Sequence, residues 1–250
     1  MLHETLHERL KTQAVCLTGL PGSGKKRLQK VLIEQFSLDA NQVLLDTELT
    51  GTELVSQVWC VIDTRSTLQG LQDRAIEEYL KFLVARVDGI IFNFTEASDL
   101  DSQSFWSRWV RQQSPELPIV RVLNQRFPAK WQGFEVSQTP KTGRPAGFQL
   151  IDFIPDNLQT FEFEVGSLHL EHLLMGLDSS KQSLGMQIWR VQAVVQTFEY
   201  VNLVAIEGTP NRWDTYAAQT DSASGWIKIQ GVGLEKVWLD EIIKASFLRA

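Results

Sequence analysis

One stretch, TGLPGSGKKR at residues 18 to 27, limits more than any other what this chain can fold into. The apolar run QAVCLTG leads into it and predicts a strand, and KKRLQKVLIEQF follows with apolar residues at helical spacing. A strand, a glycine-rich turn and a helix in that order form the local structure in which backbone N–H groups wrap a phosphate. The stretch therefore predicts an α/β domain that opens with a phosphate-binding loop.

The loop residues predict binding more clearly than they predict catalysis. Four of them match the phosphate-loop pattern: Gly19, Gly22, Gly24 and Lys25. We expect the amides around Ser23 to converge on the phosphates and Lys25 to reach the outer ones. A complete loop next carries a Ser or Thr whose hydroxyl holds Mg²⁺, and Lys26 cannot bind a cation. Since Mg²⁺ neutralises charge in phosphoryl transfer, the loop predicts nucleotide binding with weak or lost hydrolysis.

The rest of the first half continues to alternate strands with helices. Apolar runs predict strands at 42 to 46, 57 to 63, GIIFN and PIVRVL, and helical spacing predicts helices over about 68 to 87 and 101 to 113. This alternation predicts a doubly wound, mostly parallel sheet, the P-loop NTPase-like α/β architecture.

The second half has a different pattern. Between about 125 and 157, prolines and glycines interrupt any periodicity. Strands are then expected at LQTFEFEV, MQIWRVQAVVQ, VNLVAIEG and GWIKIQGVG, with one helix begun by Ser167 and another closing the chain. We therefore expect a P-loop nucleotide-binding domain over 1–127, a linker over 128–157 and a small α+β domain over 158–250.

The order of motifs resembles the CobW-type GTPases, P-loop proteins of the metallochaperone class related to the urease and hydrogenase nickel-insertion GTPases. AVCLTGLPGSGKKRL is similar to that family's opening strand and loop, and ARVDGIIFNFTEASDL to its strand ending in Asn-Lys-x-Asp. GWIKIQGVGLEKVWLDEII resembles its closing strand, glycine pair and helix, so the resemblance spans nearly the whole chain. It implies a purine nucleotide as ligand, with GTP first.

Several departures describe a shortened, degenerate member. The family's Gly-Cys-x-Cys-Cys metal motif and its switch region have no room here, because only residues 37 to 41 separate the loop helix from the next strand. The resemblance makes Asp46 the counterpart of the acidic residue that senses the metal ion, with Asp63 as its competitor and Gly51 as a remnant of the switch glycine. A strand-end aspartate that caps the next turn is an equally good explanation of either carboxylate.

Residues 93 to 96, Asn-Phe-Thr-Glu, stand where the family reads guanine. The resemblance implies that Asn93 contacts the base edge, that Phe94 replaces the stacking lysine stem, and that Glu96 keeps the carboxylate. The alternative is an eroded loop that packs Phe94 into the core.

Composition excludes other functions. A net charge of -6 and a pI near 5.3 argue against nucleic-acid binding, and no apolar run is long enough to span a membrane, so we expect a cytoplasmic protein. Cys16 and Cys60 lie in strand-like runs and are expected to be buried hydrophobes, and the pairs His3/His7 and His169/His172 to lie on solvated helix faces, so no metal site is predicted. Trp106, Trp109 and Trp238 are expected in the core, with a partner-binding face as the alternative for the first two.

Three functions therefore stay open. The first is a nucleotide-binding protein with little hydrolysis. The second is an active GTPase or ATPase that recruits Mg²⁺ through Asp46 or Asp63, with or without Thr47. The third is a scaffold with a vestigial loop that binds a protein partner instead of a nucleotide.

Overall fold

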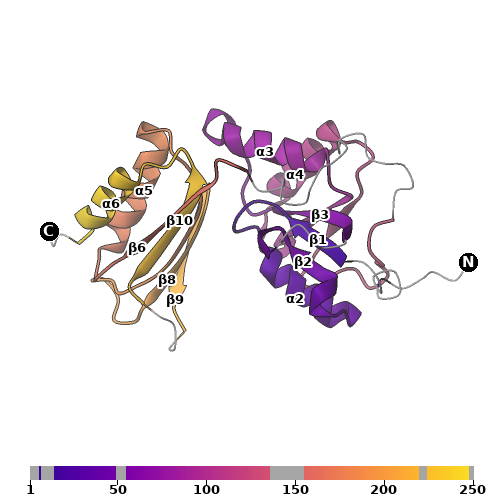
Figure 1. Ribbon diagram of the computed structural model, residues 1–250, viewed down its shortest axis with the longest axis horizontal. Helices are drawn as coiled ribbons and strands as arrows, with labels where there is room; N and C mark the ends of the chain where they lie inside the picture. Colours follow the sequence, from indigo (N-terminus) through magenta and orange to yellow (C-terminus); the bar gives the residue numbers. More distant parts are fainter. Residues whose placement is uncertain (1–5, 7–13, 49–54, 136–154, 220–223, 248–250) are drawn as a thin grey trace, which may run out of the picture. The chain divides into compact units, whose positions relative to one another are not determined.

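A computed structural model describes residues 6, 14–48, 55–135, 155–219 and 224–247, which fall into two compact units (Figure 1). The first unit comprises Met1–Thr67 and Glu77–Pro155, and the second comprises Leu68–Ile76 and Asp156–Ala250. None of the described helices is long and apolar enough to cross a membrane. Each unit has its own sheet and its own core.

The first unit is built on a five-stranded parallel sheet in the order β2-β1-β3-β4-β5. Its strands are β1 (Ala14–Thr18), β2 (Val43–Leu45), β3 (Val55–Asp63), β4 (Gly89–Asn93) and β5 (Ile119–Arg121). The chain reverses its direction of travel across the sheet between β1 and β3, and in open α/β sheets ligands bind outside the carboxyl ends of the strands at such a point. The predicted doubly wound α/β fold is confirmed.

Helices cover both faces of this sheet. Figure 1 shows α2 (Lys25–Phe36) on one side and α3 (Arg74–Val84) with α4 (Leu100–Gln113) on the other. Alternate strand residues point to opposite faces, so Val15 and Leu17 share a core with Leu28 of α2. Trp106 and Trp109 of α4 are buried, which confirms their assignment to the core, whereas Trp238 in the second unit is about half exposed and its assignment was wrong.

Aromatic side chains after β5 complete the core of the first unit. The ring centroid of Trp59 on β3 lies 5.4 Å from those of Trp131 and Phe134. A side chain at Gly89 would collide with the Phe134 ring, so the glycine makes room for it. Trp131 and Phe134 thus belong to this core although they lie in the range expected to be a linker.

The single helix expected over 68 to 87 is wrong at its beginning and its end. Residues Gly70–Asp73 form a short 3-10 turn, and the α-helix begins at Arg74 and ends at Val84. Gly70 has φ 60°, a left-handed conformation that interrupts a right-handed helix. The carboxylate of Asp73 accepts a hydrogen bond from the Gln69 amide at 2.6 Å, which ties this turn together.

The second unit carries an antiparallel sheet in the order β6-β10-β7-β8-β9. Its strands are β6 (Gln159–Glu164), β7 (Gln187–Val195), β8 (Val204–Thr209), β9 (Arg212–Ala217) and β10 (Trp226–Val232). The predicted α+β class is confirmed, but β9 was missed. It pairs with β8 across a two-residue turn, and its Trp213 ring lies over Gly208, where any side chain would collide with it.

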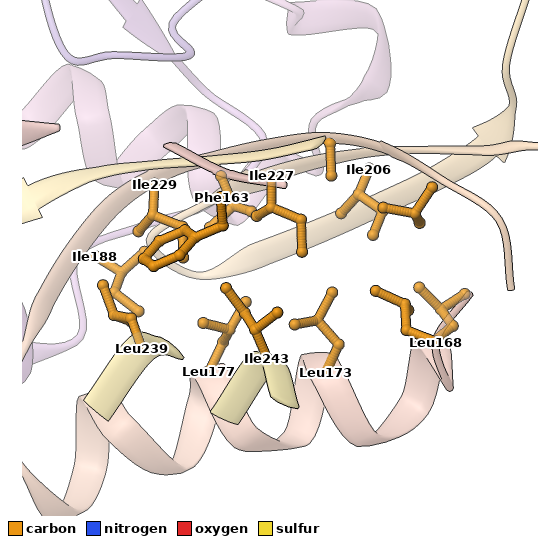
Figure 2. Close-up of a cluster of buried hydrophobic side chains, with 14 of the residues drawn as sticks. Phe163, Leu168, Leu173, Leu177, Ile188, Ile206, Ile227, Ile229, Leu239 and Ile243 are labelled. Carbon is orange, nitrogen blue, oxygen red and sulfur yellow. The ribbon is translucent and has the colours of Figure 1, made fainter. Parts of the chain in front are cut away.

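Two helices, α5 (Leu170–Ser183) and α6 (Lys236–Ala245), pack on one face of this sheet. In Figure 2 Leu173 and Leu177 of α5 and Ile243 of α6 point toward the strand side chains, among them Ile227. Helix α5 begins at Leu170 and not at Ser167, because Glu199 accepts a hydrogen bond from the Leu170 amide at 3.0 Å and so serves the helix end.

Candidate functional site

The predicted phosphate loop lies at the carboxyl end of β1, at the point where the sheet changes direction. Gly19, Gly22 and Gly24 all have positive φ values, 140°, 86° and 86°. A side chain at Gly19 would collide with the carbonyl oxygen of Val61 on β3, and one at Gly24 would collide with the side-chain amide of Asn93. Glycine is therefore required at the two ends of the loop for conformation and for space.

The loop leads directly into the amino end of α2. Gly24 is the N-cap and has no side chain that could accept from the free amides. The first hydrogen bond of the helix runs from the Leu28 amide to the Gly24 carbonyl, at 3.0 Å. The amides of Lys25, Lys26 and Arg27 therefore have no partner within the helix, and together with the helix dipole they favour an anion. The Ser23 amide itself is not one of these free donors, because it donates to the Leu20 carbonyl at 3.1 Å inside the loop.

Lys25 lies across the loop that it would serve. Its Nζ donates to the carbonyl oxygens of Gly19 at 2.6 Å and Leu20 at 3.2 Å, and it lies 3.5 Å from Asp46 Oδ2. The residue is 9% exposed. The ammonium group is therefore held at the loop by neutral carbonyls and by one carboxylate.

Asp46 lies beneath the loop at the end of β2. Its Oδ2 accepts a hydrogen bond from Thr18 Oγ1 at 2.9 Å, whereas Oδ1 is buried and bonds to none of the described residues. Ser23 Oγ is likewise buried and unbonded within the described part of the chain. Burial raises the pKa of Asp46, and the nearby Lys25 cation opposes that rise without cancelling it. Two polar atoms at the loop are thus left for a ligand or a water molecule.

Tyr79 of α3 is half-buried and lies within electrostatic range of the same carboxyl group. Burial raises the pKa of its hydroxyl, and the Asp46 carboxylate adds to the rise. The phenol therefore stays protonated beside the carboxyl group.

Asp63, the other carboxylate proposed for Mg²⁺, is already hydrogen-bonded to Arg65. The guanidinium of Arg65 donates from Nε to Oδ1 at 2.9 Å and from a terminal nitrogen to Oδ2 at 2.6 Å, and the Arg65 amide donates to Oδ1 at 3.0 Å. Both side chains are largely buried. Asp63 is therefore a strand-end cap for its own turn, one of the two explanations left open by the sequence.

The segment after β4 lies against the loop. Asn93 is fully buried, with Nδ2 donating to the Ser23 carbonyl and Oδ1 accepting from the Phe94 amide, each at 3.0 Å. Its side chain thus fixes the loop to β4. Glu96 Oε1 accepts from Arg27 at 3.2 Å. Phe94 is half buried, with φ 60°, and is not part of the buried hydrophobic core.

The remaining predicted residues are exposed, belong to the second unit or lie outside the described residues. Lys26 and Thr47 are exposed. His169 and His172 have ring centroids 5.0 Å apart, and His169 Nδ1 lies 3.3 Å from Glu199. Gly51, His3 and His7 lie outside the described residues.

The buried cysteines give the site no thiolate. Cys16 and Cys60 are fully buried on neighbouring strands of the parallel sheet, as the sequence predicts. Burial raises the pKa of the Cys60 thiol to about 12, so it stays protonated at neutral pH.

Comparison with known proteins adds little to this geometry. No protein-family model matches the sequence, and no curated protein matches it. Among solved structures, the zinc-bound YjiA GTPase from E. coli aligns with 95% of this chain and 99% of its own, at 11% identity and a TM-score of 0.32. A zinc-bound triple mutant of the YjiA GTPase aligns with 96% of this chain and 93% of its own, at 9% identity and a TM-score of 0.34. With TM-scores this low, the fold rests on the strand order and the loop geometry described above.

The sequence-based prediction did not include three residues of the site: Thr18, Arg27 and Arg65. Thr18 ends β1 and Arg65 follows β3 by two positions, so each stands at the carboxyl edge of the sheet where ligands bind. Their place at the carboxyl ends of predicted strands was the sequence signal that could have identified Thr18 and Arg65.

Proposed function

We propose that the first unit binds a purine nucleotide, with GTP as the first candidate, through its phosphates. One observation carries the proposal: the loop from Gly19 to Gly24 enters α2 with free amides at its amino end and with the Lys25 ammonium held beside them. The unbonded oxygens of Ser23 and Asp46, buried at the same loop, support a polar ligand there. GTP comes first because Glu96 keeps a carboxylate that can accept hydrogen bonds from guanine.

The contacts of Lys25 do not prevent binding. They are hydrogen bonds to two neutral carbonyls and one ion pair with Asp46, whereas a phosphate chain offers the same ammonium several anionic oxygens at once. A phosphate that entered the loop would therefore draw the ammonium away from Gly19 and Leu20. Binding requires the lysine to change partners and leaves the backbone of the loop in place.

The residues present do not fit the usual magnesium site. Lys26 offers no oxygen, both oxygens of Asp63 are bonded to Arg65, and Asp46 offers one. Mg²⁺ requires near-octahedral oxygen coordination and is normally held by a protein hydroxyl and a carboxylate together with the phosphates. We therefore propose that this chain hydrolyses nucleotide slowly or not at all.

A metal-transfer function is not part of the proposal. The described residues contain no group of three or more His, Cys, Asp or Glu side chains placed to hold a metal ion. Both cysteines are buried in the sheet, where they cannot pass an ion to another protein.

The test is titration of the full chain with GTP, GDP and ATP by calorimetry, followed by a phosphate-release assay with and without Mg²⁺. We expect all three nucleotides to bind with no release of phosphate. Magnesium-dependent turnover would favour the active GTPase or ATPase, which Asp46 Oδ1 could support as a single ligand. If none of the three nucleotides binds, the proposal is contradicted, and the protein-binding scaffold remains as the function to test.

A further inference from the structure

Phe94 is an aromatic side chain that lies against the phosphate loop. A Cβ built on Gly24 would lie 2.9 Å from Phe94 Cε2, so an edge of the ring faces the N-cap of α2. A nucleotide with its phosphates at this helix end would have this ring nearby as a surface for its base, because aromatic rings stack on bases of any kind. The carboxylate of Glu96, two residues further on, is the acceptor that could read the base edge.

Two arginines already lie on this ring. The guanidinium carbon of Arg65 is 3.5 Å from the ring centroid of Phe94, a stacking distance, and that of Arg27 is 4.6 Å away. Each is also bound to a carboxylate: Arg65 to Asp63 through two side-chain nitrogens, and Arg27 to Glu96. The ring and the carboxylate that would recognise a base are therefore both occupied by the chain itself.

The chemistry of the guanidinium makes this occupation specific. A guanidinium is a planar group of one carbon and three nitrogens that presents parallel N–H donors, and the N1–C2–N2 edge of guanine presents the same arrangement. A guanine base in this site would stack on Phe94 and donate to Glu96. Arg65 already stacks on Phe94, and Arg27 already donates to Glu96. A base that entered would exchange one stacked planar group for another and would also weaken the Asp63–Arg65 pair.

We infer that Arg65 fills the base-stacking surface of Phe94, so that the native site recognises the phosphate chain and discriminates little between bases. The ligand class is then a polyphosphate, whether a nucleoside triphosphate or inorganic tripolyphosphate. The inference rests on the proposed function and adds to it that the base contributes little to affinity until Arg65 is removed.

The experiment compares the dissociation constants of GTP, ATP and inorganic tripolyphosphate by calorimetry on the full chain. In the native protein we expect the three values to agree within about threefold. In Arg65→Ala we expect GTP to gain at least about tenfold over tripolyphosphate, because the base can now stack on Phe94. Adding Phe94→Ala to that variant should remove the gain.

A matched control uses the same pair of side chains elsewhere in the first unit. The guanidinium of Arg86 lies 3.9 Å from the ring centroid of Phe82 on α3, so Arg86→Ala removes an arginine from a phenylalanine ring outside the site. It should leave the ratio of GTP to tripolyphosphate affinity unchanged. Should Arg65→Ala misfold because Asp63 loses its partner, the double variant Asp63→Asn, Arg65→Ala removes that unpaired charge.

The outcomes separate this inference from the proposed function. A native chain that prefers GTP over tripolyphosphate by more than tenfold would overturn the inference and keep nucleotide binding. An Arg65→Ala ratio equal to the native ratio would also overturn it. Failure of all three anions to bind would overturn both proposals.

Discussion

Lys25 Nζ lies 3.5 Å from Asp46 Oδ2. Among the described residues, Lys25 is the only buried cation at the loop, and Asp46 is the carboxyl group with which it pairs. The parallel pairing of β1 with β2 contributes to this contact, because it places Asp46 beside the end of β1, from which the loop begins. A phosphate must therefore compete with a carboxylate and two carbonyls for the same ammonium. Four predictions follow from this arrangement and from the geometry of the loop.

Replacing Lys25 should strongly weaken nucleotide binding. Lys25→Ala takes away at least two charge-assisted contacts to phosphate, together worth about 3 kcal/mol or more, so GTP affinity should fall by roughly a hundredfold. Calorimetric titration measures this, with circular dichroism to check folding. The matched control is Lys30→Ala on the same helix, whose exposed side chain pairs with Glu34 at 3.8 Å and should not affect binding. Equal GTP affinity in Lys25→Ala and native protein would contradict the role of Lys25.

Restoring a hydroxyl at position 26 should introduce a magnesium effect. In Lys26→Thr the first turn of α2 regains the ligand that P-loop proteins use for Mg²⁺, so the ion should strengthen GTP binding by about tenfold more than it does in native protein. Titrations with and without Mg²⁺ measure the difference. Lys30→Thr makes the same substitution one turn further along and should show no such effect. If Lys26→Thr behaves like native protein, the missing hydroxyl is not the defect.

The raised pKa of Asp46 should appear in the pH dependence of stability. The unfolded chain has the ordinary aspartate pKa, 3.8, and the folded protein a higher one, so between the two values the folded state binds more protons. The stabilisation that Asp46 contributes is fully present below pH 3.8 and is lost as the pH rises through the pKa of the folded protein. Asp46→Asn removes this loss and keeps an acceptor for Thr18.

We therefore expect the unfolding free energy of Asp46→Asn to improve relative to native protein as the pH rises from 4 toward neutrality. Urea unfolding of both proteins at several pH values measures it. Asp63→Asn, which removes a carboxylate that is paired with Arg65 instead of Lys25, serves as the comparison. A difference between Asp46→Asn and native protein that is constant with pH would show that Asp46 does not titrate in this range.

The glycine at the start of the loop should be intolerant of any side chain. Gly19→Ala combines a positive φ with a collision against the Val61 carbonyl, so it should cost more than about 3 kcal/mol of unfolding free energy. Gly185 also has a positive φ, 66°, but nothing lies within 4 Å of a Cβ there, so Gly185→Ala should cost only about 1–2 kcal/mol. Chemical denaturation compares the two. Equal costs would mean that conformation alone, and not the approach of β3, requires glycine at position 19.

Local spacing was enough to determine much of this protein from its sequence. The strand before Gly19, the helix after Lys25 and the alternation of strands and helices follow from the pattern of apolar residues, which depends on near neighbours in the chain. The two classes of sheet followed for the same reason. The missed strand β9 and the shorter helix at Arg74 show the limit, since Trp213 packing on Gly208 and the turn at Gly70 were not visible as a period.

Only the tertiary structure decided which polar groups of the site are already bonded to one another. The register of β3 with β4 places Asp63 beside Asn93, and this brings Arg65 onto the Phe94 ring and commits Asp63 to Arg65. The same edge of the sheet joins Arg27 to Glu96, 69 positions away. A sequence lists the carboxylates and cations that could meet, but the pairing of parallel strands fixes which of them do, because it sets distances between residues that are remote along the chain.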